Sequence, residues 1–130
     1  MRLLLDTHAW FWWMMGSSRL ASRARDAIAD PANEALISPA SVSELICKVR
    51  AGILPEMARL AENVEEEIDG EGFGRLPIST RHAARAAMLV GAHPDPFDRI
   101  LIAQAQIEDI ALVSNERRFD AFGVRRLWDR

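Results

Sequence analysis

Acidic side chains stand where predicted strands end or helices begin. Asp6 ends the apolar run "RLLLD", Glu44 lies in the first turns of an apolar helix, and Glu116 lies just past "ALVS". Asp95 and Asp98 open the stretch "DPFDRILIAQA", three residues apart and therefore on one helix face. Crowded carboxylates repel one another unless a cation neutralises them, and an all-oxygen set favours Mg²⁺ or Mn²⁺. The pattern predicts a divalent-metal site suited to phosphoryl chemistry, where a metal polarises phosphate oxygens and activates water.

Each of these acids also has a purely structural alternative. Asp95 suits a helix N-cap followed by Pro96, and Asp98 lies where the helix dipole favours a carboxylate. Asp6 suits a cap for the next helix, while Glu44 and Glu116 suit solvated surface charge. The coincidence of all five at one predicted edge favours the metal site.

The elements that position these acids alternate between strand and helix. Expected strands cover residues 2–6, 34–38, 75–79, 111–114 and 124–128; expected helices cover 7–15 (with Thr7 as its cap), 18–30, 39–52, 55–69, 80–90 and 96–108, with a short turn at 116–122. The alternation implies an α/β fold, with a central parallel sheet of four to five short strands flanked by helices on both faces. Ligands of such sheets bind beyond the carboxyl ends of the strands, where the acids are expected.

Length and composition indicate an ordinary globular protein. The chain has 130 residues, 49% hydrophobic and 27% charged, which suits a single domain over residues 1–130. No apolar run approaches the roughly 20 residues of a membrane span. Asp6 and His8 interrupt the apolar N-terminal stretch too early for a signal peptide, so we expect a cytoplasmic protein without membrane contact. The single Cys47 excludes an internal disulfide and a cysteine-based zinc cluster.

Other candidates for chemistry are weaker. His8, His82 and His93 are far apart in sequence, and structural roles are favoured for them. The loop "GEGFG" follows a predicted helix instead of a strand, which argues against dinucleotide binding. The stretch "HAWFWW" is most simply core, with burial against a partner as the alternative. All but one of the 16 basic residues are arginine, a side chain that suits phosphate partners, although a high-GC genome produces the same bias.

Six segments, in order, resemble one known family nearly end to end: "LLLDTHAWFWW", "ISPASVSELICKVRAGIL", "RLPIS", "HPDPFDRILIAQA", "ALVSNERRF" and "FGVRRLW". The chain resembles a PIN domain, and specifically the VapC-type toxins of bacterial toxin–antitoxin pairs. The resemblance implies a metal-dependent ribonuclease, a small antitoxin that blocks its site, and a homodimer formed through helices.

The resemblance also assigns roles to residues. It implies that Asp6, Glu44, Asp98 and the acid after the fourth strand hold Mg²⁺ or Mn²⁺, with Asp95 close by. That last acid, Glu116, departs from the aspartate usual in the family, and its extra methylene leaves direct and water-mediated contact with the metal both open. For substrate binding, we expect Ser114 to orient a metal water and three arginines to contact the RNA backbone, namely Arg99, Arg117 and Arg118. Arg99 has the alternative of pairing with the acids.

Rival functions fit the sequence less well. A haloacid-type phosphatase needs an aspartate where His8 stands, and a receiver domain needs a lysine after a late strand, whereas Lys48 is the only lysine. The remaining alternative is a degenerate PIN module that binds RNA or protein without cleavage, and Glu116 is the feature that supports it.

Overall fold

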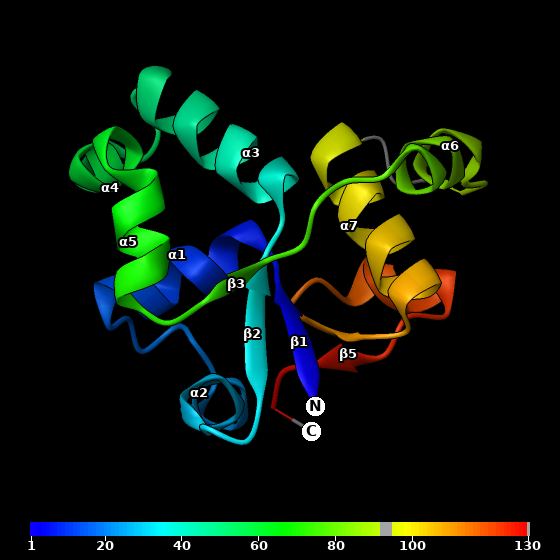
Figure 1. Cartoon of the computed structure of the whole chain (residues 1–130), viewed down its shortest axis with the longest axis horizontal. Helices are drawn as coiled ribbons and strands as arrows, with labels where there is room; N and C mark the ends of the chain where they lie inside the picture. Colours follow the sequence, from blue (N-terminus) through cyan, green and yellow to red (C-terminus); the bar gives the residue numbers. More distant parts are fainter. Residues whose placement is uncertain (92–94, 130) are drawn as a thin grey trace.

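The structure is a computed structural model that describes residues 1–91 and 95–129. Its centre is a sheet of five parallel strands in the order β3-β2-β1-β4-β5 (Figure 1). The strands are β1 (Arg2–Leu5), β2 (Glu34–Ile37), β3 (Gly74–Arg75), β4 (Ala111–Val113) and β5 (Arg126–Leu127). The predicted α/β fold with a parallel sheet of four to five short strands is confirmed.

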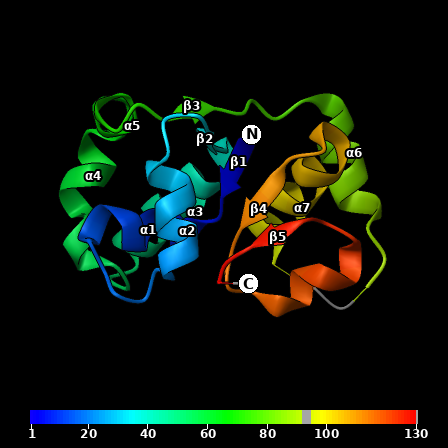
Figure 2. The same ribbon diagram turned by 90° about the horizontal axis from the view of Figure 1, so that it is seen from below.

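Helices lie on both sides of the sheet, as expected from its parallel crossovers. They are α1 (Thr7–Met15), α2 (Ser22–Ala29), α3 (Pro39–Arg50), α4 (Ala58–Glu62), α5 (Val64–Gly70), α6 (Thr80–Met88) and α7 (Pro96–Glu108), with 3₁₀ turns η1 (Pro55–Met57) and η2 (Arg117–Phe122). Figures 1 and 2 both place α1, α2, α4 and α5 on one side of the strands and α6 and α7 on the other. None of the helices in the described part of the chain combines the length and apolar character that a membrane span requires.

Alternate residues of β1 face two separate cores. Leu3 and Leu5 pack with α1 and α2, whereas Leu4 packs with α7. All three leucines are fully buried, because a central strand is covered on both faces. The run "RLLL" is therefore apolar at every position after its first residue. Burial of β1 fixes the place of Asp6, which follows directly.

The prediction of a single helix over residues 55–69 is wrong. The segment forms η1, α4 and α5, with a break at Asn63, whose φ of −131° and ψ of 40° are not helical. The Asn63 side-chain amide donates to the Arg59 carbonyl at 3.0 Å. Asparagine side chains compete in this way with the backbone bonds of a helix interior, which explains the break.

Several predicted bounds are also too wide. The third strand ends at Arg75 instead of residue 79, since Pro77 has no N–H to continue the ladder. Strand β5 covers two of the five residues expected, and α2 begins at Ser22 instead of residue 18. The structural role expected for His82 is present: its Nδ1 accepts from the Ser79 N–H at 2.9 Å. His93, by contrast, lies outside the described residues.

The aromatic stretch of α1 is mostly core, as the sequence indicates. Trp10 is fully buried and Trp12 is 9% exposed. Trp13 is half-buried and its Nε1 donates to the Glu71 carboxylate at 2.8 Å. The helix therefore buries more than one of its sides within the chain itself.

Candidate active site at the carboxyl end of the sheet

The strand order reverses between β1 and β4, the point at which open parallel sheets form a ligand-binding crevice. From β1 the chain passes outward to β2 and β3, and then returns to β4 and β5 on the opposite side. Ligands of open parallel sheets bind at the carboxyl ends of the two strands where the order reverses. Asp6 follows β1 and Ser114 follows β4 at this point. The Asp6 N–H donates to the carbonyl of Val113, the last residue of β4, at 3.1 Å, so the two strand ends lie side by side. The fold thus places two of the predicted site residues at the crevice.

Asp6 is a buried carboxyl group with defined partners. It caps α1, as its structural alternative predicts and in place of the cap expected at Thr7, and its Oδ1 accepts from the Ala9 N–H at 2.7 Å. Burial raises the pKa of Asp6 above its usual range, and this effect outweighs the hydrogen bonds from the Ser114 hydroxyl and the Ala9 N–H, which lower it. The negative charge of Glu44 contributes further to the rise. Asp6 therefore lies close to both Ser114 and Glu44.

Glu44 is held at both carboxylate oxygens. The Thr7 hydroxyl donates to Oε1 at 2.6 Å, and the Lys48 ammonium donates to Oε2 at 2.8 Å. Glu44 is 5% exposed, so both bonds lie in a region sheltered from water. The sequence analysis missed both partners. The four-residue spacing of Glu44 and Lys48 on one helix is a signal that could have found the ion pair, whereas nothing local connects Glu44 to Thr7.

Asp98 shows that the acids converge. It lies in the first turn of α7, and its pKa is raised to about 8. Burial is the largest cause, followed by the negative charges of four other carboxylates: Asp95, Glu44, Asp6 and Glu116. These are the acids predicted from the sequence to share one edge of the sheet. The structure brings them within electrostatic influence of a single carboxyl group.

Asp95 and Glu116 are both helix caps. Asp95 caps α7, with Oδ1 accepting from the N–H groups of Phe97 at 2.8 Å and Asp98 at 3.2 Å. Glu116 caps η2, where its Oε1 accepts from the Arg118 N–H at 3.2 Å. The structural alternative for Asp95 is therefore present, and it coexists with a place in the acidic cluster.

The three predicted arginines have different surroundings. The Arg99 guanidinium donates to the carbonyls of Ala86 at 3.1 Å and Leu89 at 2.6 Å, so it supports the end of α6, a role that the sequence did not indicate. The Arg118 guanidinium donates to both oxygens of Glu116, at 3.1 and 3.2 Å, which raises the pKa of Arg118. Arg117 is exposed and lines a pocket beside the acids.

The donor set fits a hard divalent cation in its chemistry. All five acids offer carboxylate oxygens, the ligands that Mg²⁺ and Mn²⁺ prefer. A cation would also neutralise the charge that raises the pKa of Asp98. In the described ranges, no group of three or more Asp, Glu, His or Cys side chains is placed to hold a metal ion.

Comparison with known proteins identifies the family. The PIN domain profile matches residues 3–124, so the chain belongs to the PIN domain family. Among its relatives, the chain is 30% identical over 124 residues to Ribonuclease VapC22 of Mycobacterium tuberculosis strain H37Rv. The match covers 89% of this chain and 88% of that protein. The resemblance noted from the sequence motifs is thereby confirmed.

Solved structures share the fold at low identity. The chain is similar to one in the Rickettsia felis VapBC2 complex bound to a promoter DNA fragment, with a TM-score of 0.65, 15% identity, and coverage of 99% of this chain and 100% of that one. For DNA-bound VapBC from Salmonella typhimurium, the TM-score is 0.66 and the identity 20%, over 98% of this chain and 97% of that one. These identities support the fold alone.

Proposed function

We propose that the chain is a metal-dependent endoribonuclease, the toxin of a toxin–antitoxin pair, formed as one PIN domain over residues 1–130. The observation that carries the proposal is the convergence of four carboxylates around Asp98 at the crevice between β1 and β4. The relative named as a ribonuclease and the VapBC structures support the same class of protein.

Three acids are proposed to hold one divalent ion, Mg²⁺ or Mn²⁺: Asp6, Glu44 and Asp98. When bound, the ion supplies a Lewis acid for the phosphodiester and a more acidic water. Asp98 must give up its proton for the ion, and Thr7 and Lys48 orient Glu44. Glu116 and Asp95 support the ion, or a second one, from their capping positions.

Other side chains are proposed to bind and orient the RNA. Ser114 is placed to orient a water beside Asp6, since its hydroxyl bonds to that carboxyl group. Arg117 and Arg118 contact the phosphate backbone from the exposed side of the crevice. We assign Arg99 to the support of α6 and α7, with RNA contact as a secondary role.

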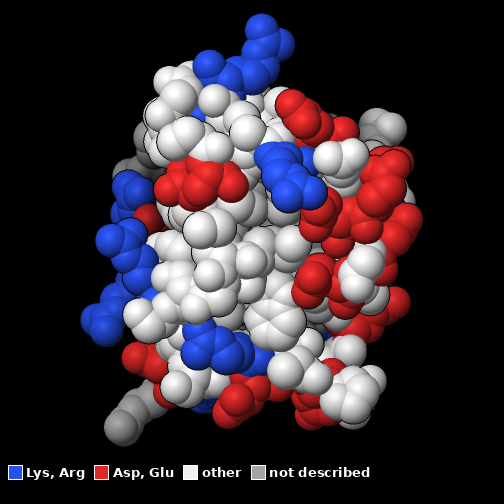
Figure 3. All heavy atoms as spheres, turned by 90° about the vertical axis from the view of Figure 1, so that its left-hand side faces the viewer, with Lys and Arg blue, Asp and Glu red and all other residues white. Residues whose placement is uncertain are grey.

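RNA is proposed to approach from the arginine-bearing side of the crevice. Figure 3 shows the face on the α4 and α5 side of the molecule, where acidic side chains gather along one edge. Helix α5 alone carries Glu65, Glu66 and Glu67 in its first turn. Because phosphates are repelled by such an edge, it is disfavoured as an RNA surface.

The proposed protein partners are a small antitoxin and a second copy of the chain. The proposed location of the complex is the cytoplasm. The relatives of known structure named above are VapBC complexes. On this chain, a pocket of about 460 Å³ is lined in part by Phe11, Met15 and Ile53. Met15 is 48% exposed and Ile53 64% exposed, and two exposed apolar side chains at one pocket favour a protein partner here.

A non-cleaving PIN module is not favoured. It rests on glutamate replacing aspartate at residue 116, yet Glu116 remains among the carboxylates that act on Asp98. A module that only binds RNA does not need a partly buried acid whose pKa is raised by burial and by four neighbouring carboxylates.

The test is cleavage of total cellular RNA by antitoxin-free protein. Samples contain Mn²⁺, Mg²⁺ or EDTA, and Asp98→Asn and the surface variant Asp26→Asn are assayed alongside. We expect discrete products with metal from the unaltered protein and from Asp26→Asn, and none with EDTA or from Asp98→Asn. Cleavage that persists in EDTA, or in Asp98→Asn, would contradict the proposal.

A further inference from the structure

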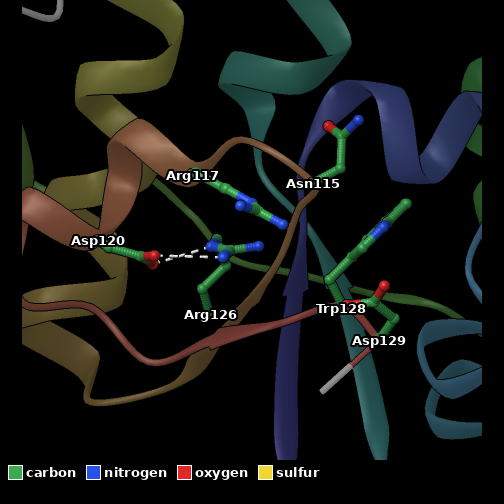
Figure 4. A pocket seen from close by; sticks show the side chains of 6 residues that line it. All are labelled: Asn115, Arg117, Asp120, Arg126, Trp128 and Asp129. Carbon is green, nitrogen blue, oxygen red and sulfur yellow. Dashed lines mark hydrogen bonds and ion pairs between the residues drawn. The ribbon is translucent and has the colours of Figure 1, made fainter.

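A pocket of about 500 Å³ lies beside the acids, at the carboxyl ends of β4 and β5. Its lining comes from the loop after β4, from η2 and from the end of β5: Asn115, Arg117, Asp120, Arg126, Trp128 and Asp129. Figure 4 shows the side chains of Arg117 and Trp128 entering it from opposite sides, with Asn115 nearby. Its volume falls within the roughly 300–1,000 Å³ typical of small-molecule sites.

Trp128 offers a stacking surface whose position is fixed. It is half-buried, and its ring lies 5.8 Å from that of Trp12, at an angle of 56°. Trp12 lies on α1 and is in turn buried in the hydrophobic core. An aromatic side chain held in this way loses little conformational entropy when a base stacks on it, and stacking accepts any of the four bases.

The two arginines of the pocket differ in whether they already have hydrogen-bond partners. Arg126 donates to Asp120 at 2.8 and 3.2 Å and to the Ser114 carbonyl at 3.1 Å, so it forms part of the wall. The Arg117 guanidinium makes no hydrogen bond or ion pair with the described residues and can contact a phosphate. Asp129 adds a negative charge that disfavours a second phosphate in the same pocket.

The loop after β4 links the pocket to the acidic cluster. The Ser114 carbonyl accepts from Arg126, while the Ser114 hydroxyl bonds to Asp6 and accepts from the Glu116 N–H at 2.9 Å. Residues 114–117 therefore contribute to the acids on one side and to the pocket on the other. A nucleotide in the pocket would place the adjoining phosphodiester toward the acids.

We propose that this pocket binds one nucleotide of single-stranded RNA, with its base stacked on Trp128 and its phosphate contacted by Arg117. Asn115 also lines the pocket, and its amide offers a donor and an acceptor to the edge of a base. This inference rests on the ribonuclease proposed above and adds the subsite that holds the substrate next to the acids.

The test is fluorescence anisotropy with a labelled single-stranded RNA decamer of mixed sequence, using antitoxin-free protein in EDTA so that binding is measured without cleavage. Because Trp128→Leu removes the stacking surface, we expect it to weaken RNA binding about tenfold or more. Trp128→Phe keeps an aromatic ring, so its Kd should stay within about threefold of that of the unaltered protein. We expect Arg117→Ala to weaken binding about fivefold and to reduce its salt dependence, because one phosphate contact is lost. The matched control is Arg23→Ala, which removes an exposed arginine of α2 and should bind like the unaltered protein.

Two results would overturn the inference. One is binding by Trp128→Leu and Arg117→Ala within twofold of the unaltered protein, and the other is no binding of the decamer by any of them. If circular dichroism shows that Trp128→Leu is unfolded, the result for Arg117→Ala decides the test. The Arg117 side chain is exposed, so its removal should leave the fold intact. Mg²⁺-dependent cleavage is scored separately. Cleavage without the expected binding pattern rejects the pocket alone, and the binding pattern without cleavage rejects the ribonuclease alone.

Discussion

Replacing Asp98 with asparagine should stabilise the metal-free protein at neutral and higher pH. The pKa of Asp98 is about 8 in the folded protein, against a usual value of 3.8. Between these two values the folded state keeps a proton that the unfolded state has released. Its stability therefore falls as pH rises from about 4 to about 8, and the loss is complete above the folded pKa. Asparagine cannot ionise, so the variant is free of this loss.

The magnitude follows from the pKa difference. One pKa unit corresponds to about 1.4 kcal/mol, so at pH 7 the roughly three units above the usual value give at most about 4 kcal/mol. Asp98 is only partly buried, and solvent screening reduces this figure to about 2 kcal/mol. For a chain of this length, that corresponds to a rise in Tm of about 5–8 °C.

The assay is thermal unfolding in EDTA at pH 5, 7 and 8.5, with Asp26→Asn on α2 as the control for loss of an exposed carboxylate. We expect the Tm advantage of Asp98→Asn to be small at pH 5 and to grow to pH 8.5. Saturating Mg²⁺ should reverse the order, because only the unaltered protein binds it at this carboxylate. An Asp98→Asn variant no more stable than the unaltered protein at pH 8.5 would refute the reasoning.

Three further outcomes are expected. The Mg²⁺-induced rise in Tm should be larger at pH 8 than at pH 6, because the ion must displace the proton of Asp98, and an equal rise at both pH values would count against this. Lys48→Met removes the ammonium partner of the buried Glu44 carboxylate and should lower the free energy of unfolding in EDTA by about 2–4 kcal/mol in urea titrations; a change below 0.5 kcal/mol would mean that the pair contributes little. Arg99→Ala should lower the free energy of unfolding by about 1–2 kcal/mol in the same titrations, because two carbonyls at the end of α6 lose their donor. The control Arg81→Ala, on the exposed face of α6, should change the free energy of unfolding by less than about 0.5 kcal/mol.

The sheet and the place of its acids could be predicted because the signals are local. A short apolar run followed by an acid, such as Leu3–Asp6, identifies a buried strand and the residue at its carboxyl end. Alternation with helices then requires parallel strands, which share one carboxyl edge. The spacing of Asp95 and Asp98 on one helix turn likewise depends on helix geometry alone.

What could not be predicted depends on contacts between distant parts of the chain. The bond from Thr7 to Glu44 joins residues 37 apart in sequence, and Arg99 meets the carbonyls of α6 only because α6 packs against α7. The break at Asn63 depends on one side chain competing with a backbone bond in an otherwise periodic segment. The pKa of Asp98 depends on burial and on four charges from other segments. Sequence periodicity contains none of this information.

The capping roles of the acids support the functional roles that we propose for them. Asp6 and Asp95 each use Oδ1 to accept backbone N–H groups of the helix they begin. Those bonds fix the side-chain rotamers, and the positive ends of α1 and α7 offset part of the repulsion between the carboxylates. The cap thus holds the acids near one another before any cation arrives. Asparagine caps a helix about as well as aspartate, so substitution by asparagine removes the charge and keeps the cap, whereas alanine removes both. Only the asparagine variants can therefore separate the chemistry of the site from the stability of the helices that carry it.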